Sequence, residues 1–334
     1  MRLARVAGPD GLARLAAIGP EGEVVDLALA ARRRLERRGA TAEGAARLAA
    51  AWFPGSLTAA LGGGERWWEE AAEALAGAGT DATVDPAGLT WLPPVDPPVM
   101  RDCLVFGEHL RNAYGRLGLA VPEQFYEMPV YYKGNPTSLI GHEGAAIWPG
   151  YAEAVDYELE LGFVVGRAGR NLTPEEAVGH LAGVTIFDDF SARDIQAHEM
   201  GAMLGPSKCK DFCTAVGPCV TTLDELRLDG LEMVARVNGE EWSRGSSADM
   251  IWSAAEIVAW VSQCETVQAG DLIGSGTVGR GCGLELGRQL APGDAVELEV
   301  GGIGVLRNRL TRPEPPGWRP TPRRPQPEGA DARS

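Results

Sequence analysis

The feature that most limits how this chain can fold is a cluster of prolines near residue 95. The segment Leu92-Pro-Pro-Val-Asp-Pro-Pro-Val99 places four prolines within six residues. Proline lacks a backbone N–H and fixes φ, so neither a helix nor a central strand can run through this segment. We therefore expect a boundary here, between a first region of residues 1–92 and a second region of residues 100–310.

The first region is expected to be a small, largely helical α+β domain. Ala, Leu, Arg and Glu recur with helix-like spacing over 26–38, 42–52 and 65–77. Residues 3–7 and 15–18 flank a Gly-Pro-Asp-Gly turn and are typical of a short β-hairpin. No polar cluster in this region indicates a site.

The second region is expected to be dominated by strands. Strand-like runs lie at 154–165, 183–187, 233–237 and 295–300, and helical stretches at 174–181 and 254–261. This pattern favours an α+β domain over an alternating βαβ sheet. Residues 311–334 hold seven prolines and almost no aliphatic residues, so this tail is expected to be disordered.

Composition excludes several classes of function. The 46 acidic and 31 basic residues give a formal charge of −15, which repels nucleic acids and anionic membranes. No stretch approaches the roughly 18 apolar residues of a membrane helix. The six cysteines form no C-x-x-C pair, and the N-terminus shows no apolar signal region. These features predict a reduced, cytoplasmic protein that acts on a small molecule.

Three acidic residues share one face of a predicted strand. In 156–165 the alternation places Asp156, Glu158 and Glu160 opposite an apolar face. The Cα atoms of the two glutamates would lie roughly 7 Å apart, so their charges repel and raise each other's pKa unless a cation or water neutralises them. A hard divalent ion fits this arrangement. An edge strand whose outward acids prevent aggregation explains the same pattern about equally well.

Further polar residues follow the strand at 183–187. Capping of a helix by Asp189 or Ser191 explains only one member of the crowded set Asp188, Asp189, Arg193, Asp194 and Gln196, so a polar pocket accounts for more of it. Elsewhere, Asp102 precedes a histidine, His109, although an isolated histidine is more often structural. The G-x-G-x-x-G match at 274–279 is not read as a dinucleotide site, because a strand, rather than a helix, is expected at 284–286.

Together these segments resemble the fumarylacetoacetate hydrolase family from about residue 102 to residue 309. Five motifs agree in order and spacing: Asp102 with His109, Glu158 with Glu160, Asp189 to Gln196, Leu204 to Phe212, and Ser275 to Leu286. The resemblance implies a strand-dominated catalytic domain with the family's mixed β-sandwich or β-roll fold. Residues 1–92 carry no comparable motif.

The resemblance also implies a set of roles. Asp102, Glu158, Glu160 and Asp189 would bind one Mg²⁺, with Ca²⁺ or Mn²⁺ as alternatives. His109, supported by Glu285, would activate water. The remaining implied residues lie on the substrate side, where Arg193, Gln196 and Lys210 would stabilise oxyanions and Tyr132 and Thr277 would contact the substrate.

The reaction implied by this likeness is hydrolysis of a carbon–carbon bond in a 1,3-diketo acid, such as a fumarylacetoacetate-like or acylpyruvate-like substrate. Water would add to a carbonyl polarised by the metal, and the carbanion would leave as a metal-bound enolate. The alternative reading is that the same site decarboxylates, isomerises or dehydrates a 2-oxo acid, with a biosynthetic pathway as one setting. A non-catalytic, metal-stabilised binding protein is a third reading. The resemblance also implies a homodimer. Cys103 and Leu104 stand where the fumarylacetoacetase motif has aromatic residues, so the identity of the substrate's acyl group stays open.

Overall fold

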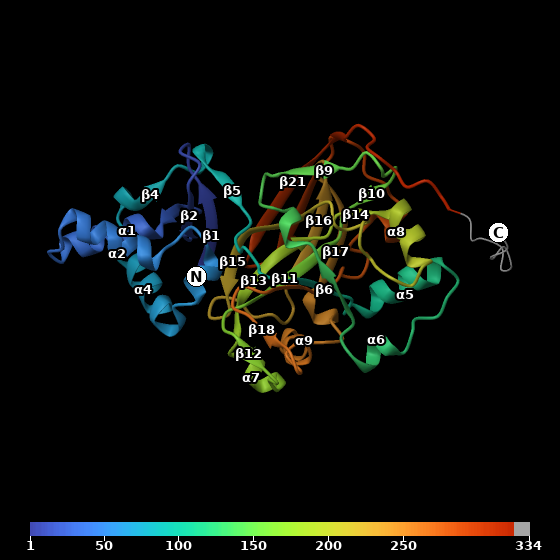
Figure 1. The fold of residues 1–334 in the computed structure, drawn as a ribbon, viewed down its shortest axis with the longest axis horizontal. Helices are drawn as coiled ribbons and strands as arrows, with labels where there is room; N and C mark the ends of the chain where they lie inside the picture. Colours follow the sequence, from blue (N-terminus) through green and yellow to red (C-terminus); the bar gives the residue numbers. More distant parts are fainter. Residues whose placement is uncertain (324–334) are drawn as a thin grey trace, which may run out of the picture.

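A computed structural model describes residues 1–323 of the chain (Figure 1). Its largest sheet contains twelve strands, and the order along its main path is β4-β3-β2-β1-β15-β13-β11-β19-β6-β7. The bounds along this path are β4 (Thr83–Val84), β3 (Val24–Asp26), β2 (Ala13–Ile18), β1 (Arg2–Ala7), β15 (Thr214–Thr222), β13 (Leu181–Asp188), β11 (Leu159–Val165), β19 (Leu272–Gly274), β6 (Met100–Cys103) and β7 (Tyr131–Gly134). Two further strands pair beside the path, β5 (Thr90–Leu92) with β1 and β8 (Leu139–Ile140) with β15.

A second sheet of five strands packs against the large one. Its order is β17 (Glu240–Ser246), β16 (Glu232–Val237), β20 (Ala295–Val300), β21 (Gly304–Pro313) and β9 (Ala145–Trp148). Two small ladders complete the strands: β10 (Val155–Asp156) with β14 (Ser191–Ala192), and β12 (Gly169–Arg170) with β18 (Thr266–Val267). Leu161 of β11, Met233 of β16 and Leu298 of β20 belong to one buried core between the sheets. The fold is therefore the strand-rich α+β class predicted from the sequence, and its solved neighbours share it.

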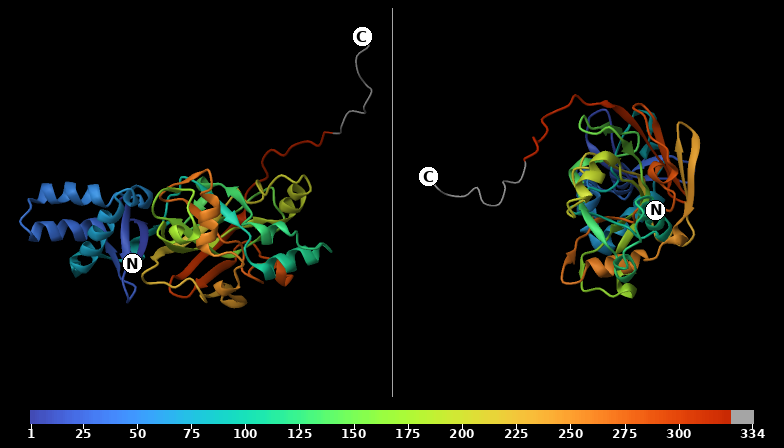
Figure 2. Two further views of the ribbon diagram at one scale, coloured as in Figure 1. Left: turned by 90° about the horizontal axis from the view of Figure 1, so that it is seen from below. Right: turned by 90° about the vertical axis from the view of Figure 1, so that its right-hand side faces the viewer.

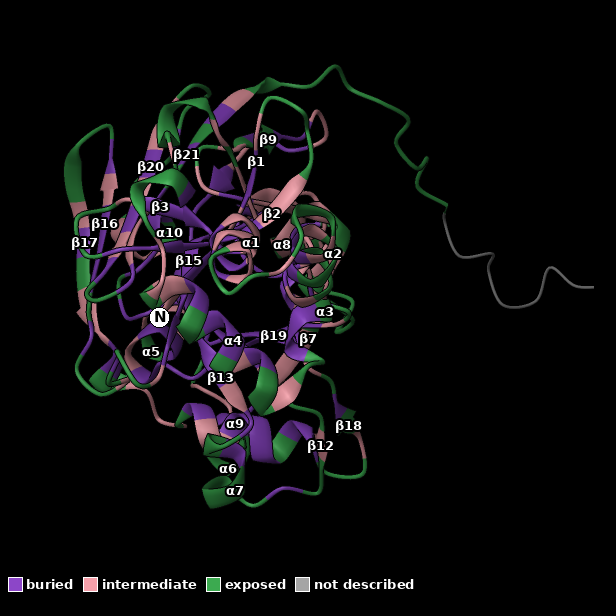
Figure 3. Ribbon diagram, turned by 90° about the vertical axis from the view of Figure 1, so that its left-hand side faces the viewer, coloured by how far each residue is buried: buried purple, intermediate pink, exposed green. Residues whose placement is uncertain are grey.

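The helices lie around these sheets, and their bounds are α1 (Leu27–Arg37), α2 (Ala42–Trp52), α3 (Leu57–Leu61), α4 (Gly64–Ala76), α5 (Gly107–Arg116), α6 (Gln124–Glu127), α7 (Pro174–Val178), α8 (Arg193–Met200), α9 (Ala254–Val261) and α10 (Gly283–Leu286). Figure 2 shows α1 and α2 side by side at one end of the molecule. Figure 3 shows that the central strands are buried, whereas α2 and α7 are largely exposed. No helix within residues 1–323 is long and apolar enough to cross a membrane.

The first region continues the large sheet of the second. Leu3 of β1 pairs with Val220 of β15, and a second core cluster contains Leu27 and Trp67 of the first region together with Val164 and Phe187 of the second. The predicted division into domains at residues 92 and 100 stays a prediction, but one sheet and one core cluster cross it.

Several predicted elements differ from the structure in their bounds or type. The helix predicted at 174–181 ends at Val178, because Gly179 follows and Leu181 already belongs to β13. The strand predicted at 284–286 is the short helix α10. The tail predicted from residue 311 begins later, because β21 continues to Pro313 in parallel pairing with β9. Residues 324–334 of the predicted tail lie outside the described residues.

Candidate metal and proton-transfer site

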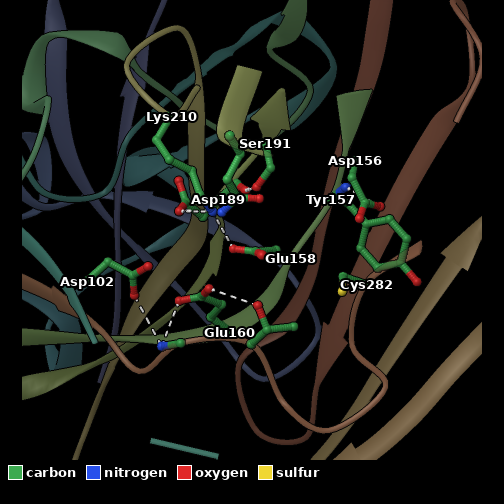
Figure 4. Close-up of polar contacts among 12 residues, drawn as sticks. Asp102, Asp156, Tyr157, Glu158, Glu160, Asp189, Ser191, Lys210 and Cys282 are labelled. Carbon is green, nitrogen blue, oxygen red and sulfur yellow. Dashed lines mark hydrogen bonds and ion pairs between the residues drawn. The ribbon is translucent and has the colours of Figure 1, made fainter. Parts of the chain in front are cut away.

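Four carboxylates meet in the interior of the second region. Asp102 lies in β6, Glu160 in β11, Glu158 just before β11, and Asp189 just after β13. One oxygen atom from each lies within 4.8 Å of the others, and all four residues are at most 5% exposed. Figure 4 shows them pointing toward one another.

The register of three strands explains why two of these carboxylates meet. Gly274 of β19 lies opposite Asp102 in β6 and opposite Gly162 in β11. A β-carbon at Gly274 would lie 2.3 Å from Asp102 Oδ1 and 3.1 Å from Glu160 Oε2. The backbone N–H of Gly276 donates to Asp102 Oδ1 at 3.1 Å and to Glu160 Oε2 at 2.9 Å. Glycine at 274 thus makes room for the carboxylates, and the following turn orients them.

Burial makes this cluster electrostatically unfavourable without a cation. Desolvation, followed by the charge of Asp189, raises the pKa of Asp102 well above its usual range. Desolvation, followed by the charge of Asp102, does the same to the pKa of Glu160. Mg²⁺, Ca²⁺ and Mn²⁺ prefer carboxylate oxygens as ligands, and a bound ion would offset the repulsion between these buried carboxylates. The residues present therefore fit a divalent metal ion.

Two cations lie on one side of the cluster. Lys210 Nζ lies 2.5 Å from Glu158 Oε2 and 2.6 Å from Asp189 Oδ2, and Arg193 Nη1 lies 2.9 Å from Glu158 Oε1. Burial opposes ionisation of Glu158, but Lys210 and Arg193 hold its pKa at about 2. The carboxylates are thus of two kinds, because nearby cations lower the pKa of Glu158, whereas burial raises the pKa values of Asp102, Glu160 and Asp189.

A histidine and a glutamate form a second cluster beside the carboxylates. His109 of α5 places Nδ1 2.8 Å from Glu285 Oε2. Asn112 Nδ2 and the backbone N–H of Arg280 donate to Glu285 Oε1 at 2.8 and 3.0 Å. Burial opposes ionisation of Glu285, but the hydrogen bond with His109 lowers its pKa. A carboxylate acceptor at Nδ1 favours the tautomer of His109 that carries its proton on Nδ1, which places the imidazole lone pair on Nε2.

The other predicted site residues also lie here. Tyr132 Oη donates to Asp189 Oδ2 at 2.6 Å, and Thr277 Oγ1 lies 3.4 Å from Glu160 Oε1. Gln196 Oε1 accepts from Arg193 Nη1 at 2.9 Å. The structure thus brings all eleven predicted site residues into one region, and their individual roles remain predictions.

Some readings of the sequence are wrong in detail. The acids at 156, 158 and 160 do not protect a sheet edge, because β13 and β19 flank β11 and all three side chains are buried. Neither Asp189 nor Ser191 caps α8, which begins after Ala192 without a side-chain cap. Asp194 does not enter the pocket but accepts from the backbone N–H groups of residues 153 and 154.

Two buried acids near the site were given no role by the sequence reasoning. Asp188 Oδ1 accepts from the backbone N–H of Glu158 at 3.0 Å, and burial raises its pKa well above the usual range. Asp156 binds Arg193 and the start of α10 instead of joining the four carboxylates. No local sequence signal identifies the partners of Asp156, because they come from α8 and α10.

Comparisons with known proteins assign the chain to a family. A family model described as the C-terminal domain of fumarylacetoacetate (FAA) hydrolase matches residues 99–311. The chain belongs to the fumarylacetoacetate hydrolase family. The family match covers the region that carries every residue of the site.

Among relatives in this family, the human mitochondrial oxaloacetate tautomerase FAHD2A is 30% identical over 224 residues, or 66% of this chain and 69% of that protein. A fumarylacetoacetate hydrolase structure from Exiguobacterium antarcticum has a TM-score of 0.70 at 24% identity and covers 93% of this chain and 99% of its own. A maleylpyruvate hydrolase from Sphingobium sp. SYK-6, solved with manganese(II) and pyruvate, has a TM-score of 0.68 at 20% identity and covers 94% of this chain and 100% of its own. Both structures support the fold, and the names together span tautomerase and hydrolase activities.

Proposed function

We propose that this protein is a divalent-metal-dependent enzyme that generates and protonates the enolate of a short 1,3-dicarbonyl acid. One observation carries the proposal: four buried carboxylates lie beside a His109–Glu285 pair whose glutamate favours the ionised state. A divalent ion held by the carboxylates would polarise the substrate's carbonyl oxygens. The manganese and pyruvate in the Sphingobium hydrolase support a site of this kind.

His109 would perform the proton transfer. With Nδ1 donating to Glu285, its Nε2 can accept a proton from the carbon between the two carbonyl groups and return it elsewhere. Arg193 and Lys210 would balance the negative charge that develops on oxygen, an effect worth a few kcal/mol for each donor. Neither step needs a covalent nucleophile.

Keto–enol tautomerisation of an oxaloacetate-like acid is the first candidate reaction, because it needs only this proton transfer. The 30% identical human relative, an oxaloacetate tautomerase, supports it.

Hydrolysis of a carbon–carbon bond in a 1,3-diketo acid is the second candidate. The His109–Glu285 pair favours it, because an imidazole held by an ionised carboxylate is suited to deprotonating water. Water would add to one carbonyl, the adjacent carbon–carbon bond would break, and the carbon left with the electron pair would take up a proton as the enolate collapses.

A substrate panel separates the two reactions. The loss of enol absorbance is followed for oxaloacetate, acylpyruvates, fumarylpyruvate and fumarylacetoacetate, with Mg²⁺ or Mn²⁺ and again with EDTA, and the products are identified by mass. Ketonisation without a change of mass establishes a tautomerase, and fragments that together contain one added water establish a hydrolase. His109→Ala should abolish either reaction while metal binding, measured by calorimetry, persists. Silence across the panel with both metals would overturn the proposal and favour a non-catalytic role.

A further inference from the structure

The carboxylate of Asp156 connects the two halves of the site. Asp156 is 4% exposed and lies in β10, two residues before Glu158. Its Oδ2 accepts from Arg193 Nε at 2.9 Å, and Arg193 Nη2 lies 2.8 Å away. Its Oδ1 accepts from the backbone N–H of Tyr157 at 3.0 Å. One face of this carboxylate thus fixes the guanidinium that neutralises Glu158.

The same carboxylate holds the start of α10. The backbone N–H groups of Gly283 and Leu284 donate to Asp156 Oδ1 and Oδ2 at 2.8 and 2.9 Å. Cys282, which precedes the helix, offers no side-chain cap of its own. Asp156 therefore caps α10 from a distant strand, and the third residue of this helix is Glu285. Figure 4 shows Asp156 near Cys282 and apart from the four carboxylates.

The local sequence is adapted to this contact. A β-carbon at Gly283 would lie 2.6 Å from Asp156 Oδ1 and 2.7 Å from the carbonyl oxygen of Arg288. On the other side, Asp156 pairs with Ser191 in the β10–β14 ladder, which leads directly into α8 and Arg193. Asp156 is thus held between the two elements that it joins.

We propose that Asp156 is a positioning residue that sets the geometry of Arg193 and of the His109–Glu285 pair together. It acts through these residues and does not itself contact the substrate. The proposal rests on the function proposed above for its effect on turnover, but its effect on the geometry of His109 can be measured without any substrate.

The test compares Asp156→Asn with Asp194→Asn. Both residues are carboxylates that bind backbone N–H groups near β10, but the described hydrogen bonds of the Asp194 side chain go to residues 153 and 154, whereas those of Asp156 go to the Arg193 guanidinium and to α10. In D156N we expect kcat to fall about 10- to 100-fold, the range typical of lost supporting hydrogen bonds, while the calorimetric Kd for Mn²⁺ changes less than about threefold. In D194N both quantities should stay at the parent values.

The readout without substrate is the imidazole NMR spectrum of the full chain, which contains four histidines. The Nδ1 proton of His109, assigned with His109→Asn, should shift or exchange faster in D156N and keep its parent shift and exchange rate in D194N. If D156N does not fold, Gly283→Ala displaces the same carboxylate and should give the same changes. An unchanged His109 signal, or a loss of Mn²⁺ affinity equal to the loss of kcat, would overturn the positioning role. A shifted signal in a protein silent across the substrate panel would sustain it while refuting the proposed function.

Discussion

At the scale of single residues, the site depends on buried carboxylates whose like charges repel each other. Asp102 and Glu160 are buried together, and their pKa values are raised. The alternation of residues 156–165 predicts that Glu158 and Glu160 project on one side, and the structure confirms that Tyr157, Leu159 and Leu161 face the core on the other. The sequence could not reveal that Glu158 is the ionised member, because its cations come from residues 193 and 210, which only the folded chain brings to it.

Removal of one carboxylate should affect metal binding and stability in opposite directions. Glu160→Gln keeps the side-chain volume but removes a ligand charge, so the Kd for Mg²⁺ should rise on the order of 100-fold. In EDTA, however, the variant should unfold at a higher temperature than the parent at pH 8, because a buried like-charge repulsion is gone. Calorimetry and thermal unfolding measure the two effects, with the exposed Glu175→Gln as control. Unchanged metal affinity would exclude Glu160 as a ligand.

The metal-free protein should lose stability as the pH rises. A carboxyl group whose pKa is higher in the folded than in the unfolded protein binds more protons when folded, so the free energy of unfolding falls as pH rises from the unfolded value, about 4, through the folded value. Asp102 and Glu160 both have this sign. Thermal unfolding from pH 5 to pH 8 should therefore show stabilisation by Mg²⁺ over EDTA that grows with pH. A stabilisation that shrinks toward pH 8 would contradict this assignment.

At the scale of elements, the strand register brings the ligands together. Regular periodicity predicted α2 and α9 with their observed bounds, since each shows one continuous pattern along the chain. The interruption between β10 and β11 was not predicted, because the apolar alternation continues while the chain passes from pairing with β14 to pairing with β13. Likewise, α10 is only four residues long, and its distant cap on Asp156 has no local sequence signal.

A substitution that adds a methyl group in β19 should test whether the spacing of β6, β19 and β11 sets metal affinity, because it removes no ligand. Gly274→Ala places a β-carbon within 2.3 Å of Asp102 Oδ1, so the carboxylate must move. We expect metal affinity to fall by at least about tenfold, because coordination depends on ligand position to within a few tenths of an ångström. The control is Gly88→Ala, where no atom lies within 4 Å of the added carbon. Parent affinity in G274A, measured by calorimetry, would show that the strands tolerate a wider spacing.

At the scale of the whole molecule, the proline segment marks a change of region but not an end of the sheet. Pro93, Pro94, Pro97 and Pro98 lie between β5 and β6, where they interrupt no strand. Sequence reasoning detects this local break readily. It does not detect that β1, near the other end of the first region, returns to pair with β15, because such a pairing joins residues more than two hundred positions apart.

Deletion of residues 1–92 should therefore damage the catalytic region. The deletion removes β1 from the edge of β15 and uncovers Val216, Val220 and Phe187, which are all buried against the first region. An exposed strand edge with an apolar face favours aggregation. We expect the truncated chain to be aggregated or to unfold at a temperature at least about 10 °C lower than the full chain, as measured by light scattering and calorimetry.

The truncation control is a chain that ends at residue 323 and so keeps every residue that the structure describes. A chain of residues 93–334 that stays monodisperse and unfolds at the parent temperature would show that the second region folds alone, as the proline boundary by itself predicts. If that chain also bound Mg²⁺ with parent affinity, the first region would be dispensable for the carboxylate site. Aggregation of the truncated chain but not of the control would instead establish that the shared core holds the strands carrying Glu160 and Asp189 in place.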